Sequence, residues 1–348
     1  MLQDTTLARA GVPPPYASMP GKAPMPGDSQ GISKGPPGPV RQIAENLQGP
    51  LAEQQAGLGN LFAQIGALVG ARSEGKVSLP DPVVKAMQQI LGLRLNPSAN
   101  LSGKDLQAAV RLSGQFREAQ LPSPGGGQQP LPDLKSALLS LKSLLQQFGA
   151  EARINRPAGQ PATPSRHGAP RGQAQQSGGG FWAGDTAQNL KSLLQETDSA
   201  LARIRLTQLV NSGLAKDDGP RHASRPMDLV LELPIALGQE TGVMQMQVGR
   251  DGGGKDGEDE HEPAWRLRFA LDLTATGPLE AAISLRGGGT YASLWVDRKE
   301  TFDHLNALRE TMEAAFADAG LDLQEFRLIR GLPPRTAARS GALIDRQS

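Results

Sequence analysis

Between Trp265 and Gly331 the spacing of apolar residues changes from that of strands to that of a helix, and then back. Apolar residues alternate with polar ones on both sides of Thr276-Gly277-Pro278, and a third alternating run follows the glycines 287–289. A period of two predicts strands with one buried face. The apolar members of the three runs are Trp265, Leu267, Phe269, Leu271, Leu273, Leu279, Ala281, Ile283, Leu285, Leu294 and Val296.

After these runs, apolar residues recur at steps of three and four, which predicts a helix with one apolar face. Thr301 is the expected N-cap and Gly320 the expected left-handed residue after the helix. A last strand is predicted from Leu321 to Ile329. The apolar face consists of Phe302, Leu305, Leu308, Met312, Ala315, Phe316 and Ala319.

Two earlier alternating runs, Leu229–Leu233 and Met244–Val248, predict a strand pair ahead of this unit. Short turns between consecutive strands indicate antiparallel pairing. The predicted fold class is therefore α+β: a small antiparallel sheet with one packed helix at the C-terminus, spanning residues 227–331.

Composition indicates a looser N-terminal part, a largely disordered and partly helical arm. The 348 residues include 42 Gly and 28 Pro, and only 4% are aromatic, which limits the core that the chain can bury. The remaining predicted segments are a disordered N-terminus at 1–40, a weakly helical arm at 41–149, a flexible linker at 150–182, an amphipathic helix at 183–213 and a disordered tail at 332–348.

Two of these segments leave alternatives open. The helical patterns of 41–149 fit either a small bundle or transient helices in a flexible arm, and their glycines favour the arm because each weakens a helix by roughly 1 kcal/mol relative to Ala. The helix at 183–213 could dock beside the folded domain or bind a partner, and docking is favoured.

The sequence contains no set of residues that indicates catalysis or a cofactor. The absence of Cys excludes disulfides, thiolate zinc sites and a Cys nucleophile. The four His residues lack metal-ligand spacing, the acidic run 250–262 lacks that of a calcium loop, and the glycine runs lack a phosphate-loop ending. We therefore expect no enzyme activity, no cofactor, no metal and no small-molecule substrate.

Charge and hydropathy limit the partners that we expect and the cellular location of the protein. A net charge of +1 indicates no nucleic-acid partner, and the lack of an 18-residue apolar run indicates no stable membrane insertion. The N-terminus lacks the apolar core of a cleaved signal peptide, so a cytoplasmic protein is the plain expectation.

The last third of the chain resembles the C-terminal domain of the bacterial flagellar hook-length control protein family. Thr276 stands where that family usually has Leu, and Leu279 and Ala281 replace its usual valines. The matching pieces are Thr276-Gly277-Pro278-Leu279-Glu280-Ala281, Tyr291 to Val296, Thr301 to Leu308, and Gly320-Leu321 to Gly331.

The resemblance implies hook-length control and switching of export substrate specificity through contact with the type III export gate. The implied partners are the cytoplasmic domain of the export-gate switch protein and the hook and hook-cap subunits. It also implies a second route for the protein, export through the flagellar type III apparatus. The alternative is a non-exported α+β protein-binding module of another secretion or cytosolic pathway.

Candidate partner-binding residues lie at the rim of the predicted sheet, where loops carry contacts. The turn supplies Gly277, Pro278, Leu279 and Glu280, although Gly277 and Pro278 could equally serve only the backbone of the turn. Alternation puts Glu280 on the face opposite Leu279, where we expect it to meet solvent. The exposed side of the helix supplies Asp303, His304 and Arg309.

Overall fold

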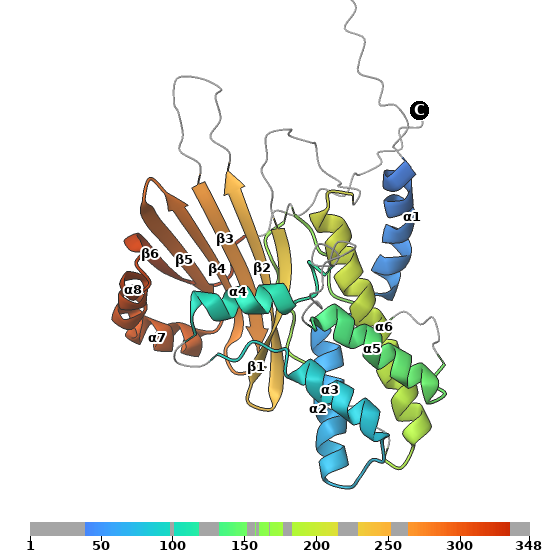
Figure 1. Ribbon diagram of the computed structural model, residues 1–348. Coiled ribbons are helices and arrows are strands. Elements are labelled where there is room, and N and C mark those ends of the chain that lie inside the picture. The colour runs from blue at the N-terminus through green and yellow to red at the C-terminus, as the bar shows by residue number, and fades with distance from the viewer. Residues whose placement is uncertain are drawn as a thin grey trace, which may run out of the picture. The chain divides into compact units, whose positions relative to one another are not determined.

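The computed structural model describes residues 39–97, 101–117, 132–151, 157, 160–166, 168–176, 183–214, 229–251 and 264–334. Within these ranges the chain forms eight helices and one six-stranded sheet, which confirms the α+β class (Figure 1). The predicted disordered ends, apart from residues 39, 40 and 332–334, lie outside the described residues, as does most of the acidic run.

The elements follow one another in chain order as helices first and strands later, with two helices before the last strand. They are α1 Pro39–Gln54, α2 Leu58–Ser73, α3 Asp81–Leu91, α4 Gly103–Leu112, α5 Leu134–Gln147, α6 Thr186–Asn211, β1 Leu229–Leu237, β2 Glu240–Asp251, β3 Ala264–Leu273, β4 Gly277–Arg286, β5 Gly289–Val296, α7 Lys299–Ala307, α8 Arg309–Asp318 and β6 Asp322–Arg330.

The six strands form one sheet in the order of the chain. Each neighbouring pair from β1 to β5 is antiparallel, as the short turns predict. The last pair, β5 with β6, is parallel, so the expectation of a wholly antiparallel sheet is wrong. The helical connection is the reason, because α7 and α8 carry the chain from the end of β5 back to the end of the sheet at which β5 began.

That connection consists of two helices instead of the single predicted one. The helix predicted from Thr301 begins earlier, at Lys299, and breaks at Leu308, where α7 ends before α8 begins. Leu308 is neither glycine nor proline, so nothing in the sequence marks the break. Gly320 follows α8 with a φ of 73°, as predicted for the residue that ends the helix.

The helices of residues 41–149 favour the bundle over the flexible arm. Buried residues of α2, α3 and α5 form one apolar core together with α6 and with Val243 of β2. Among the glycines that suggested looseness, Gly57 is closely packed, since a Cβ on it would lie 2.5 Å from Gln173 Oε1, whereas a Cβ on Gly59 would make only ordinary contact, 3.8 Å from Val243. The core therefore outweighs the cost of glycine within the helices.

Helix α6 is buried on more sides than the predicted single stripe. Its buried residues include Leu193 and Leu206 as well as Leu190, Leu201 and Ile204. It packs against α1, α2, α5 and β1, as the docking interpretation expects, and so joins the helices to the sheet.

Described stretches of the predicted linker (150–182) lie against the folded chain. The side-chain amide of Gln55 donates to the Pro161 carbonyl at 2.8 Å, and that of Gln247 donates to the Ser165 carbonyl at 2.9 Å. These contacts are made by polar groups, in a segment that has few large apolar residues, and its flexibility stays a prediction.

The wedge segment, residues 171–176, enters the sheet between β2 and β3. Gln173 forms an antiparallel bridge with Val243 of β2, and Ala174 forms a parallel bridge with Asp272 of β3. These bridges lie beyond the point where β2 and β3 pair directly with each other. The wedge segment thus supplies hydrogen bonds to the backbone where the two strands separate.

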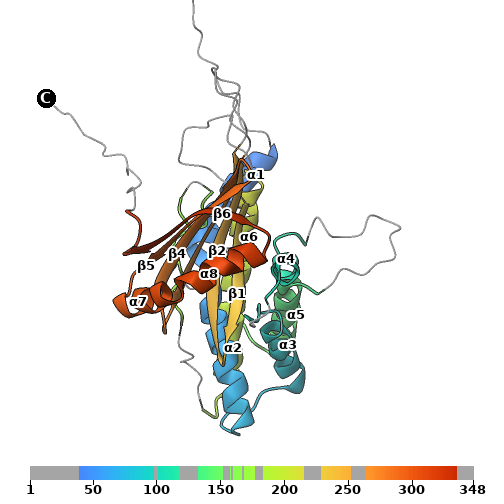
Figure 2. The ribbon, with the colours of Figure 1, turned by 90° about the vertical axis from the view of Figure 1, so that its left-hand side faces the viewer.

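Different helices cover the two faces of the sheet. Leu231, Leu233 and Met246 form an apolar cluster on one face, under α4, which crosses the strands (Figures 1 and 2). On the opposite face Val243 joins the helical core, and Glu232 meets α6. We call these the α4 face and the α6 face.

Candidate functional site

The β3–β4 turn is fixed by residues at the start of α7. Gly277 has a φ of 72°, and a Cβ placed on it would lie 2.6 Å from Nε of Arg298. Arg298 Nη1 donates to the Thr274 carbonyl at 2.8 Å, and the Thr301 hydroxyl donates to the Thr276 carbonyl at 2.8 Å. A glycine is therefore required here both by the backbone conformation and by the close approach of Arg298.

The same end of the sheet gathers charges and the wedge segment. Burial raises the pKa of the Asp272 carboxyl, while the nearby Arg298 lowers it and Asp297 raises it. The Thr274 amide donates to Oε1 of Gln175 at 2.9 Å. Three parts of the chain, the turn, the start of α7 and the wedge segment, thus meet at one rim of the sheet.

The predicted turn residues lie at this rim, but they are not freely exposed. Gly277 is buried, and Pro278 and Leu279 are half-buried. The Pro278 carbonyl accepts from the Asp297 amide at 3.2 Å, which ties β4 to the residues leading into α7. The contacts of Gly277 and Pro278 thus favour the interpretation that these two residues serve the backbone of the turn. The exposed surface of the rim belongs to neighbouring residues.

Glu280 does not meet solvent, contrary to prediction. Alternation placed it correctly on the face opposite Leu279, but its exposed fraction is only 6%. Glu280 lies on a central strand, opposite Ala270 on β3 and Trp295 on β5. Alternation assigns a side chain to a face of the sheet, whereas neighbouring strands and covering segments decide whether that face reaches water.

The three predicted helix residues separate into two groups. Asp303 and His304 are exposed on α7, one turn after its first residue, Lys299, and so belong to the rim. Arg309 is half-buried as a whole residue and lies beside β6, after the break at the end of α7. Its Nη2 donates to the Phe326 carbonyl at 2.6 Å, and its Nε lies 2.8 Å from Glu313 Oε1.

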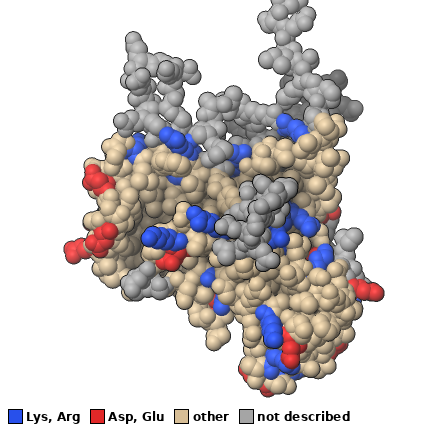
Figure 3. Space-filling view, viewed as in Figure 1, with Lys and Arg blue, Asp and Glu red and all other residues tan. Residues whose placement is uncertain are grey.

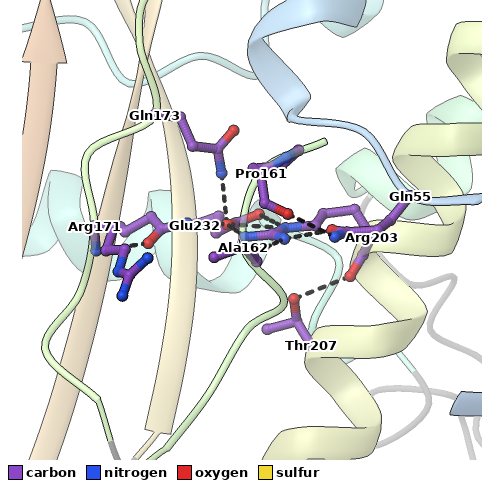
Figure 4. Close-up of polar contacts among 9 residues, drawn as sticks. Gln55, Pro161, Ala162, Arg171, Gln173, Arg203, Thr207 and Glu232 are labelled. Carbon is purple, nitrogen blue, oxygen red and sulfur yellow. Dashed lines mark hydrogen bonds and ion pairs between the residues drawn. The ribbon is translucent and has the colours of Figure 1, made fainter. Parts of the chain in front are cut away.

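A buried ion pair between α6 and β1 was missed by sequence reasoning (Figure 4). Arg203 and Glu232 are 0% and 3% exposed, and Arg203 Nη2 donates to Glu232 Oε1 at 2.6 Å. Arg203 Nε lies 3.0 Å from the other carboxylate oxygen. The side-chain amides of Gln173 and Gln245 each donate to Oε1 at 2.7 Å.

The remaining donors of Arg203 reach two further parts of the chain. Its Nη1 donates to the Ala162 carbonyl at 2.6 Å and to Oε1 of Gln55. The ion pair therefore connects α6, β1, β2, the end of α1 and the predicted linker. The cluster thus joins these elements through side-chain and backbone groups. A buried pair with its hydrogen bonds satisfied specifies an arrangement more than it adds stability.

Two sequence signals could have revealed this pair. Arg203 lies between Leu201 and Ile204, inside the apolar pattern of its helix. Glu232 lies in the apolar run LVLELPI, where it alternates with the leucines of the predicted strand. Opposite charges within two apolar elements indicate a buried pair, because burial of either charge without the other would cost much more free energy.

The described residues were also compared with what a metal site and a membrane-spanning helix require. Among them, no three His, Asp or Glu side chains come together as metal ligands. None of the helices described is both long and apolar enough to cross a membrane. His167, His222 and His261 lie outside the described residues.

The end of the chain that carries the rim also matches a known family. Residues 253–335 match the Flg_hook family model, flagellar hook-length control protein FliK. This match confirms the resemblance of the C-terminal domain. It covers about a quarter of the chain, from the residues just before β3 to those just after β6.

The Flg_hook match contains the turn and the α7 part of the rim but neither the wedge segment nor the helical core. The turn, α7 and Arg309 lie inside the matched residues, whereas Arg203, Glu232 and the wedge segment lie outside them. No curated protein and no solved structure matches the chain.

Proposed function

We propose that this chain is a flagellar hook-length control protein that acts by protein contact and has no enzyme activity. The observation that carries the proposal is the Flg_hook match over β3, β4, β5, α7, α8 and β6, a contiguous part of the sheet with its helical crossover. Export through the flagellar type III apparatus, and contacts with hook and hook-cap subunits, are part of the same proposal.

The rim is the surface we assign to the export-gate switch protein. Hydrogen bonds from Arg298 and Thr301 hold its backbone, so exposed side chains are presented from a fixed frame. Exposed residues at the rim are Thr274, Ala275, Lys299, Glu300, Asp303 and His304. Acidic side chains also lie over α8, at the margin of the molecule in Figure 3, but they are not part of the surface assigned here.

The test is hook length in the source bacterium, measured by electron microscopy together with filament number. Deletion of residues 227–348 should give overlong hooks and few filaments, because it removes the whole sheet. Asp303→Lys should give the same phenotype more weakly while leaving the melting temperature nearly unchanged, since an exposed i,i+4 pair such as Lys299–Asp303 contributes little to stability.

Asp318→Lys is the matched control, since Asp318 is also exposed but lies at the end of α8, away from the turn. It should leave hooks normal. Normal hooks in the deletion strain would refute hook control and favour the non-exported binding module. Abnormal hooks in the deletion strain with normal hooks in the Asp303→Lys strain would refute the rim as the contact surface.

A further inference from the structure

Helix α4 covers an apolar part of the sheet without being buried itself. No residue of α4 is buried, and its apolar contacts with the α4 face come from Leu106 and Val110, four residues apart on one side of the helix. Beneath them lie the buried residues Leu231, Leu233 and Met246. A fully buried surface is thus shielded by a short helix that makes few contacts of its own.

The chain is anchored to the rest of the fold both before and after α4. After the carboxyl end, the Gln208 side chain donates to the Gly114 and Gln115 carbonyls at 3.2 and 3.0 Å, and Lys135 Nζ in turn donates to Gln208 at 2.7 Å. Gly114 has a φ of 82°, and a Cβ on it would lie 2.6 Å from the Lys135 amide. This end is therefore anchored to the helical core.

At the amino end, the hydrogen bonds of the described residues are local to the helix. The Ser102 amide donates to the Asp105 carboxylate at 2.9 Å, and the Asp105 amide donates back to the Ser102 hydroxyl at 3.3 Å. Leu101, just before them, is 44% exposed. This cap stabilises the helix but does not attach it to the sheet. Before the helix, the Leu95 amide donates to the Pro234 carbonyl and the Leu95 carbonyl accepts from the Ala236 amide, both at 2.8 Å. The helix α4 thus lies between two anchored points, and its own contacts with the sheet are those of its side chains.

The apolar surface also extends past α4. Leu271 pairs with Leu279, and Leu267 pairs with Ile283, in the register that continues the α4 face onto β4. All four side chains are only half-buried with α4 in place. A helix longer than the ten residues of α4 could therefore bury more apolar area on this face than α4 does.

We propose that α4 is a displaceable occupant of a helix-binding surface, and that the partner contributes an amphipathic helix with apolar residues four positions apart. Leu106 and Val110 pack against the sheet, and their spacing defines the spacing of apolar residues that the partner helix must have. Met244 and Met246 suit such exchange, because flexible thioether side chains repack around different ligands. The proposal goes beyond hook control and does not depend on it.

The first test uses the absence of cysteine in the chain. A Met246→Cys variant carries one thiol under α4, and a Leu141→Cys variant carries one in the helical core, where Leu141 is likewise buried. If α4 opens locally, a thiol reagent should label the first variant at least about tenfold faster than the second under native conditions. Equal rates, both matching global unfolding, would refute the proposal.

A second substitution in the Met246→Cys background shows which helix opens. Leu106→Ser removes a contact of α4 with the sheet and should raise the labelling rate further. Gln107→Ser, on the exposed side of the same helix, should leave the rate unchanged. A rate that responds equally to both substitutions would mean that opening does not involve release of the apolar side of α4.

The second test measures binding of a helix supplied in trans. The probe is a fluorescent peptide of residues 101–117, titrated against the full chain carrying Leu106→Asp and Val110→Asp. We expect saturable binding at least about tenfold tighter than to the unaltered chain, because the internal competitor is removed. A peptide with the same two aspartates should not bind. Absence of saturable binding, or loss of the cooperative melt in the variant chain, would show that α4 is an integral part of the fold.

Discussion

Burial of the Glu196 carboxylate on α6 lowers the stability of the folded protein. Among the described residues its Oε2 atom is buried and has no hydrogen-bond partner. Burial raises the pKa of the Glu196 carboxyl, so the folded state binds the proton more tightly than the unfolded state does. The ionised form therefore costs stability at neutral pH, and this cost disappears as the pH falls through the folded-state pKa.

Replacement of Glu196 by Gln should remove that cost. We expect Glu196→Gln to stabilise the protein by about 1 kcal/mol at pH 7.5, measured by thermal melting, because a neutral amide is less costly to bury than an unpaired charge. The gain should shrink toward pH 4, where the unaltered protein binds the proton. Glu310→Gln, at an exposed position on α8, is the control and should leave the melting temperature unchanged at both pH values. A gain of equal size at both pH values would contradict the assignment to ionisation.

At the scale of elements, the wedge segment behaves as part of the sheet. The Gln175 amide donates to the Asp272 carbonyl at 3.0 Å, and the Arg171 amide donates to the Gln245 side chain at 2.9 Å. Gly172 lies against β3 so closely that a Cβ would be 2.7 Å from the Leu271 carbonyl carbon. The contact is with backbone, which cannot move aside as a flexible side chain can.

Gly172→Ala should therefore destabilise the protein by about 1–3 kcal/mol, the usual cost of forcing a methyl group into a filled site. Gly168→Ala is the matched control from the same part of the chain, since a Cβ on Gly168 meets nothing within 4 Å. Chemical denaturation of the two variants measures the difference. Equal stability would mean that the wedge segment leaves the sheet at little cost, as a flexible linker would.

At the scale of the whole molecule, the helices and the sheet share one core. The apolar cluster contains residues of α2, α3, α5 and α6 together with Val243 of β2, and the Arg203–Glu232 pair crosses the same junction. This arrangement differs from the separate C-terminal domain and flexible arm expected from composition. The Flg_hook residues 253–335 thus form one part of a larger packed unit.

Brief trypsin digestion should leave α2, α3 and α5 associated with α6 and the sheet. We expect native size-exclusion chromatography followed by mass measurement to recover these parts in one peak, even where the chain between them has been cut, because their shared core remains. Survival of a fragment that begins near Asp185, without the earlier helices, would restore the interpretation of a flexible arm.

The sequence by itself determined what depends on neighbouring residues along the chain. Periodicity located the strands from Leu229 onward and most helices, and Gly320 marked the end of α8, because side-chain period and left-handed backbone are local properties. The family resemblance of residues 253–335 was visible for the same reason, since it depends on spacing and on a few glycines.

Only the tertiary structure decided which surfaces meet. Burial of Glu280, the pairing of Arg203 with Glu232, and the insertion of the wedge segment into the sheet each depend on residues distant in sequence. The parallel β6 likewise follows from the path of a crossover. Alternation assigns a polar side chain to one side of a strand, but the fold alone decides whether water or another part of the chain lies there.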